Sequence, residues 1–99
     1  MSNLFDIYNE EIYLRNKLFQ KITNFKYLAI IISDQYWNAR FEISIRVPEK
    51  YLKYMINDKD YSVRMEVADR IDKKYLSLMM NDISYIVIDM VSKRLKENK

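Results

Sequence analysis

The sequence contains no cysteine, no histidine and no glycine, and it has one proline among its 99 residues. The absence of cysteine excludes disulfide bonds, thiolate nucleophiles and thiolate-bound metals. The absence of histidine removes the usual general base near neutral pH. Phosphate-cradling loops need glycine for tight turns and close backbone approach, so neither a P-loop nor a dinucleotide-binding fingerprint can form. We therefore expect a protein that is not an enzyme and that holds no cofactor or metal.

Long apolar runs are also lacking, because the longest, Tyr27 to Ile32, is far shorter than the roughly 20 residues that a membrane helix needs. Residues 1–9 show no targeting signal, so we expect a cytoplasmic protein without membrane contact. The chain is 49% apolar and 31% charged, which is typical of one globular domain, 1–99. Its net charge of +3 favours an anionic partner only weakly. Abundant Ile, Lys, Asn and Tyr indicate an AT-rich source, such as a low-GC bacterium or its phage.

An internal repeat appears when the sequence is aligned with itself at an offset of 24 residues. It predicts three units, 33–56, 57–80 and 81–99, preceded by a degenerate N-terminal repeat, 1–32, of the kind expected at the end of a repeat array. The aligned sets include Asp34, Asp58 and Asp82; Trp37, Tyr61 and Tyr85; Ala39, Val63 and Val87; Ile43, Val67 and Val91; Arg46, Arg70 and Arg94; and Val47, Ile71 and Leu95.

Each unit has the pattern of two helices. Val63, Val67 and Ile71 recur every four residues and predict a long helix over about 59–71, with Asp58 as its N-cap. A shorter helix is expected over 72–80, with Asp72 as its cap, and Pro48 occupies the corresponding first turn one unit earlier. No segment shows the alternation of a strand, so the predicted fold class is all-α.

The long helix carries a second apolar stripe, Tyr61, Met65 and Ala68, which indicates neighbours on two sides. This is the situation of a helix inside a solenoid. We therefore predict a short α-solenoid of about four 24-residue repeats, each a long helix followed by a short one.

Arg64 falls between the two stripes, so we expect it to be buried and to need a charged partner. Asp58, six residues earlier, is the expected partner, and Arg40 should pair in the same way with Asp34. These pairs would form a structural ladder along the stack. It ends in the third unit, where Ile88 replaces the arginine.

The unit D-x-x-x-x-V-R-x-x-V-A-x-R-I over residues 58–71, followed by Y-L-x-x-M, resembles the leucine-rich repeat variant, which belongs with the HEAT-like helical repeats. The likeness covers residues 33–99 and, loosely, 14–32. It implies α-helices alternating with short, often 3₁₀, helices in a right-handed superhelix, and it implies no enzymatic activity. Ile88 in place of arginine and Pro48 in place of Asp72 depart from the pattern, which affects the expected regularity.

Arg46, Arg70 and Arg94 lie at the border between the apolar stripe and the outward face of the long helices. Stacking would align them in a row that could bind phosphates or a partner's carboxylates in bidentate fashion. Alternatively, each pairs with a glutamate four residues earlier, such as Glu42 or Glu66. The sequence leaves both readings open.

Two further sets could carry chemistry, but structural roles explain them more simply. The carboxylate pairs Asp58/Asp60 and Asp69/Asp72 could act as acid and base or hold a cation, yet these positions suit helix caps. Trp37 with Asp34 is similar to the aromatic and acidic residues of some HEAT-like DNA glycosylases. Trp37 also shares its repeat position with tyrosines, which favours packing between units.

These observations predict a non-catalytic module that binds another protein, as an adaptor or a small occluding inhibitor. The alternative is binding of a nucleic-acid backbone through the arginine row and the nearby Lys50, Lys74 and Lys93.

In the last unit Ile86 and Met90 take outward positions that are polar one unit earlier, with Ile83 nearby. We expect them to contact the partner or a second copy of the chain, forming a homodimer, because exposed apolar patches mark interaction surfaces. The alternative is that residues 93–99 fold back over them.

Overall fold

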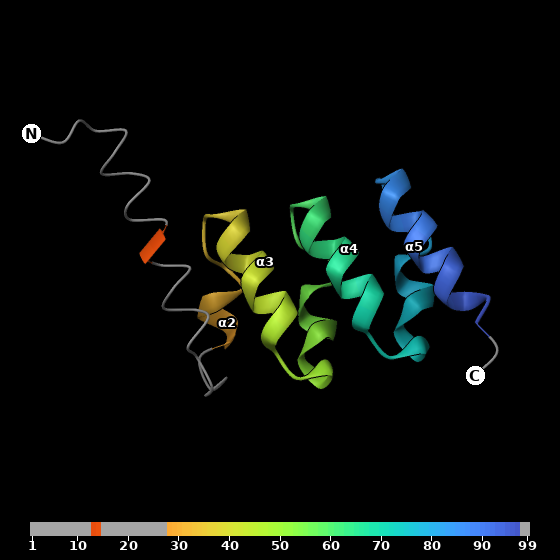
Figure 1. Ribbon diagram of the computed structural model, residues 1–99, viewed down its shortest axis with the longest axis horizontal. Coiled ribbons are helices and arrows are strands. Elements are labelled where there is room, and N and C mark those ends of the chain that lie inside the picture. Colours follow the sequence, from red (N-terminus) through yellow and green to blue (C-terminus); the bar gives the residue numbers. More distant parts are fainter. Residues whose placement is uncertain (1–12, 15–27, 98–99) are drawn as a thin grey trace, which may run out of the picture.

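The computed structural model describes residues 13–14 and 28–97, and these residues form helices and short connections without a strand. Short and long helices alternate along the chain (Figure 1). The elements are α2 (Leu28–Ile31), α3 (Trp37–Arg46), the 3₁₀ helix η2 (Glu49–Met55), α4 (Tyr61–Arg70), the 3₁₀ helix η3 (Lys73–Met79) and α5 (Tyr85–Leu95). The all-α prediction is confirmed for this part of the chain. The degenerate first repeat lies mostly outside it.

The elements recur at the spacing found in the sequence. Helices α3, α4 and α5 begin at residues 37, 61 and 85, and the two 3₁₀ helices begin at 49 and 73. Figure 1 shows α3, α4 and α5 side by side in chain order and running in the same direction. Helix α4 packs against both α3 and α5, so it has a neighbour on each side, as its two apolar stripes predicted.

The predicted core stripe is confirmed, since Val63, Val67 and Ile71 are fully buried, as are their counterparts in α3. The second stripe is only partly buried. Ala68 is covered and Met65 packs against the core, but Tyr61 is 47% exposed. The aromatic side chain at the start of α4 is therefore only partly covered by its neighbours.

The N-cap prediction for the long helix is wrong by two residues. Asp60, not Asp58, caps α4, because its carboxylate accepts a hydrogen bond of 2.8 Å from the backbone N–H of Ser62. Asp58 instead accepts from the N–H of Asp60 and takes part in an ion pair. The helix consequently spans 61–70 rather than 59–71.

The shorter helices are of the 3₁₀ type. Asp72 caps η3 as predicted, by accepting a 3.0 Å hydrogen bond from the N–H of Lys74. Pro48 is the N-cap of η2 instead of a residue of its first turn. No residue in the described part of the chain has a positive φ angle, which explains how these turns form without glycine.

Candidate functional site

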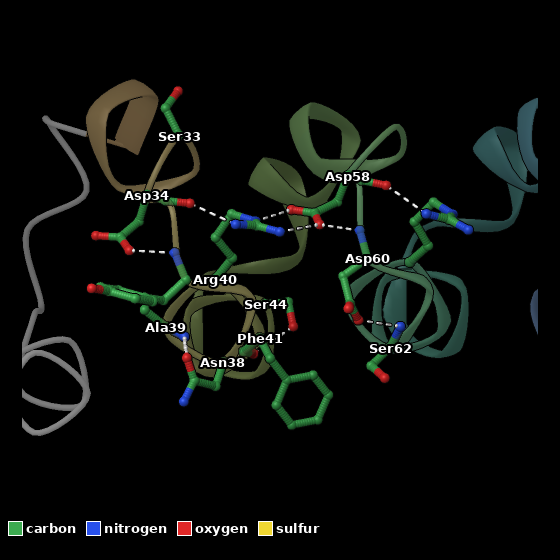
Figure 2. A network of polar contacts seen from close by, with 12 residues as sticks. Ser33, Asp34, Asn38, Ala39, Arg40, Phe41, Ser44, Asp58, Asp60 and Ser62 are labelled. Carbon is green, nitrogen blue, oxygen red and sulfur yellow. Dashed lines mark hydrogen bonds and ion pairs between the residues drawn. The ribbon is translucent and has the colours of Figure 1, made fainter. Parts of the chain in front are cut away.

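Two buried arginines connect successive units through the same set of hydrogen bonds. Arg40 donates from Nε and Nη2 to the two carboxylate oxygens of Asp58, at 2.8 and 3.2 Å, and from Nη1 to the backbone carbonyl of Asp34 at 2.6 Å. Figure 2 shows this arginine between the two aspartates. Arg64 repeats the three contacts 24 residues later, with Asp82 and with the carbonyl of Asp58.

The predicted ladder therefore exists, but its register was wrong. Each arginine pairs with the carboxylate 18 residues later, in the next unit, and reaches only the backbone carbonyl of the aspartate six residues earlier. The reason is the placement of successive units, because all three aspartates have the same local turn. Each of these aspartates uses Oδ1 to accept from the backbone N–H two residues on, which fixes its carboxylate against its own turn. The following loop then presents its own aspartate to the arginine.

These ion pairs are almost completely shielded from solvent. The side chains of Arg40 and Asp58 are 8% and 4% exposed, and those of Arg64 and Asp82 are 9% and 8% exposed. Bidentate geometry and a third bond to a carbonyl compensate the cost of removing the charges from water. Ile88 takes the arginine position in α5, so the described ladder ends at Asp82.

Arg70 and Arg94 each connect their own helix to the C-terminal end of the preceding long helix. Arg70 donates to the backbone carbonyls of Ser44 and Val47, the latter at 2.6 Å. Arg94 repeats this on Ala68, at 3.0 Å, and on Ile71. The last carbonyls of a helix have no partner within it, and a cation there also interacts favourably with the helix dipole. The carbonyl of Ser44 in particular cannot bond four residues on, because Pro48 has no N–H.

Neither reading of the arginine row predicted this arrangement. The described residues include no ion pair of Arg70 with Glu66, and two of the three guanidinium groups bind backbone within the molecule. Arg46 is exposed. Binding of a partner by this row stays a prediction, and Arg46 is its most accessible member.

The side chain of Glu66, on α4, is partly buried. Partial burial is the main reason that its pKa is raised above the ordinary value of 4.5, the Asp69 carboxylate raises it further, and Arg70 opposes the shift.

The last unit exposes the apolar side chains that the sequence singled out, with one exception. Ile83 is 97% exposed and Ile86 47%, whereas Met90 is partly buried against the core. The expected outward position of Met90 is therefore wrong. Residues 93–95 continue α5, and Lys73 holds the carbonyl of Glu97 at 2.7 Å, so the described part of the C-terminal segment does not fold back over Ile86.

Further apolar side chains are exposed at matching positions of successive units. One set lies in the short helices α2, η2 and η3, and another lies in the first turns of the long helices, where the Trp37 ring also packs edge to face against Phe41. Packing between units, the predicted role of Trp37 and its counterparts, accounts for only part of the Trp37 surface, because this side chain is 48% exposed. The sets are Ile30, Tyr54 and Leu78, and Trp37, Tyr61 and Tyr85.

Two adjacent hollows lie beside the ladder. The first is lined by Ile32, Tyr54 and Met55, and the second by Ile56, Leu78 and Met79, with residues 57–59 shared between them. Every described lining residue of the first hollow has its counterpart 24 residues later in the second. The sequence repeat thus produces an equivalent hollow in two successive units.

No family model, curated protein or solved structure matches the chain. The resemblance to the leucine-rich repeat variant therefore stays a prediction based on the residues quoted for it. Within the described residues there is no group of three or more acidic side chains that could hold a metal ion, and no helix is long and apolar enough to cross a membrane.

Proposed function

We propose that the chain is a non-catalytic helical-repeat module, a short right-handed solenoid of about four units, that binds another protein. We base this on the partners that the arginines bind and on the apolar side chains that remain exposed. Both buried arginines and two of the three arginines of the row bind within the molecule, whereas apolar side chains recur on the surface at 24-residue spacing. A surface of repeated apolar contacts favours a protein partner.

The same observation weakens the nucleic-acid alternative. Guanidinium groups that donate to backbone carbonyls have fewer free N–H groups for phosphate.

The test is capture of partners on the immobilised chain from a lysate of the source cells, with and without nuclease. A protein partner should be retained at the same level after nuclease treatment, and its retention should change little with salt. Loss of every captured protein on nuclease treatment, with affinity falling steeply as salt rises, would contradict the proposal and favour the nucleic-acid alternative.

Ile86→Ser serves as the surface variant in this experiment, because the side chain is 47% exposed and its loss should not unfold the chain. We expect reduced capture. Ile45→Ser, at a 42% exposed site on α3, is the matched control and should capture normally.

A further inference from the structure

We propose that the two hollows beside the ladder form one binding groove for an extended peptide in the polyproline II conformation, with apolar side chains three residues apart and a carboxylate between them. The inference rests on the proposed protein-binding function and names the surface and the kind of partner.

The spacing of the two hollows matches the repeat of a polyproline II peptide. The hollows belong to successive units and share Asn57, Asp58 and Lys59, so they are contiguous. Packed helices lie about 8–10 Å apart, which sets the distance between equivalent points of neighbouring units. A polyproline II helix has three residues per turn and advances about 3.1 Å per residue, so side chains three residues apart lie on one side at about 9 Å. One peptide turn thus matches one unit.

The shape and polarity of each hollow suit one apolar side chain. Tyr54 in the first and Leu78 in the second are exposed by 59% and 67%, above the buried side chains of Met55 and Met79. Each hollow thereby offers an apolar wall and floor for one side chain.

A polyproline II peptide has no internal hydrogen bonds, so its backbone groups need partners. Asn57 is exposed in both hollows and Asn81 in the second. A primary amide can both donate to and accept from a peptide group.

The charge at the junction of the hollows favours an acidic residue in the peptide. In the second hollow both carboxylates are neutralised, Asp58 by Arg40 and Asp82 by Arg64. Lys59 is exposed, lies where the two hollows meet, and has no ion-pair partner among the described residues. A carboxylate between the two apolar side chains of the peptide would meet this ammonium group.

The experiment is a fluorescence anisotropy titration of the full chain with a labelled peptide of four Pro-Leu-Glu triplets. We expect saturable binding that weakens at least tenfold for Leu78→Ser and for Tyr54→Ser. Ile45→Ser, outside both hollows, should bind like the original chain. Each variant is checked by circular dichroism, and because both groove substitutions are at exposed sites, at least one folded variant is expected.

Two matched peptides test spacing and charge. A peptide of the same composition with its leucines two residues apart, which places them on different sides of a polyproline II helix, should bind at least tenfold more weakly. Lys59→Glu should lose affinity for the Pro-Leu-Glu peptide and gain it for a peptide of Pro-Leu-Lys triplets. Equal binding of both leucine spacings, or affinity that neither groove variant changes, would overturn the inference.

A displacement experiment separates this inference from the proposed function. If a nuclease-resistant protein is captured and the Pro-Leu-Glu peptide displaces it, both are supported. If the protein is captured but is neither displaced nor affected by Leu78→Ser, the groove is wrong and the protein-binding function stands. If a twelve-nucleotide oligothymidylate displaces the peptide and no protein is captured, both fail.

Discussion

Arg64 donates two hydrogen bonds to the carboxylate of Asp82 in the next unit and a third to the backbone carbonyl of Asp58 in its own unit. We expect Arg64→Ala to lower the free energy of unfolding by about 3 kcal/mol or more, because it leaves the Asp82 carboxylate buried without its counter-ion. Urea denaturation followed by circular dichroism measures this loss. Arg46→Ala, at an exposed arginine, is the matched control and should change stability by less than about 0.5 kcal/mol. Equal losses for the two variants would contradict the structural role of the ladder.

Glu66 gives a prediction that depends on pH. Its pKa is raised in the folded chain, so as pH rises the unfolded chain loses this proton first, and the ionised carboxylate then costs stability. This loss of stability is absent at pH values below the ordinary pKa of the carboxyl group and complete at pH values above its pKa in the folded chain. Glu66→Gln should therefore raise the melting temperature at pH 7 and leave it unchanged at pH 3.

The neighbouring carboxylate provides the control for that experiment. Asp69→Asn removes the second cause of the shift and should raise the melting temperature at pH 7 in the same direction but by less, because burial, the larger cause, remains. A destabilised Glu66→Gln variant at pH 7 would show that the glutamate is stabilising in its charged form.

At the scale of elements, the three long helices begin with different caps at equivalent positions. Asp60 accepts a hydrogen bond at the start of α4, whereas Ser84, the N-cap of α5, makes no side-chain cap bond. We expect Ser84→Asp to reproduce the α4 cap and to stabilise the chain by about 0.5–1 kcal/mol, measured as a shift in the urea midpoint. Asp60→Ala should destabilise by a similar amount. If neither substitution moves the midpoint, these caps contribute nothing measurable.

The helix positions could be predicted from the sequence because they depend on local spacing. The period of 24 residues, the fully buried stripe of α4 and the Asp72 cap all follow from short-range rules. The Asp60 cap was missed because two carboxylates, Asp58 and Asp60, both suit a helix start. What decides between them is the ion pair of Asp58 with Arg40, a contact between units.

Contacts between units also explain the errors in the predicted site. The arginine ladder and the helix-end contacts join residues 18, 23 and 26 positions apart, and their register depends on how far one unit is displaced from the next. One clue was available, since Pro48 leaves the Ser44 carbonyl without its usual donor. The hollows were missed because each is lined by residues of two successive units, and the repeat pattern alone does not show where the packed units leave space between them.

At the scale of the whole molecule, the last unit leaves open a face that earlier units cover. Val47 and Ile71 are fully buried, but Leu95, at the same repeat position, is 43% exposed. Helix α4 packs against both α3 and α5, whereas among the described elements α5 packs mainly against α4 and η3. Exposed apolar side chains that gather in one unit favour association with another surface.

We therefore expect the chain to self-associate through its C-terminal unit, with a mass in light scattering that rises with concentration. Ile83→Ser combined with Ile86→Ser should reduce this mass toward that of one chain and leave the helical spectrum unchanged, because both side chains are exposed, by 97% and 47%. Met90→Glu should instead lower the melting temperature, since Met90 packs against the core. Ile45→Ser, on α3, should leave the mass unchanged. A mass that is independent of concentration, or that the double substitution does not alter, would show that the exposed end serves a different partner or none.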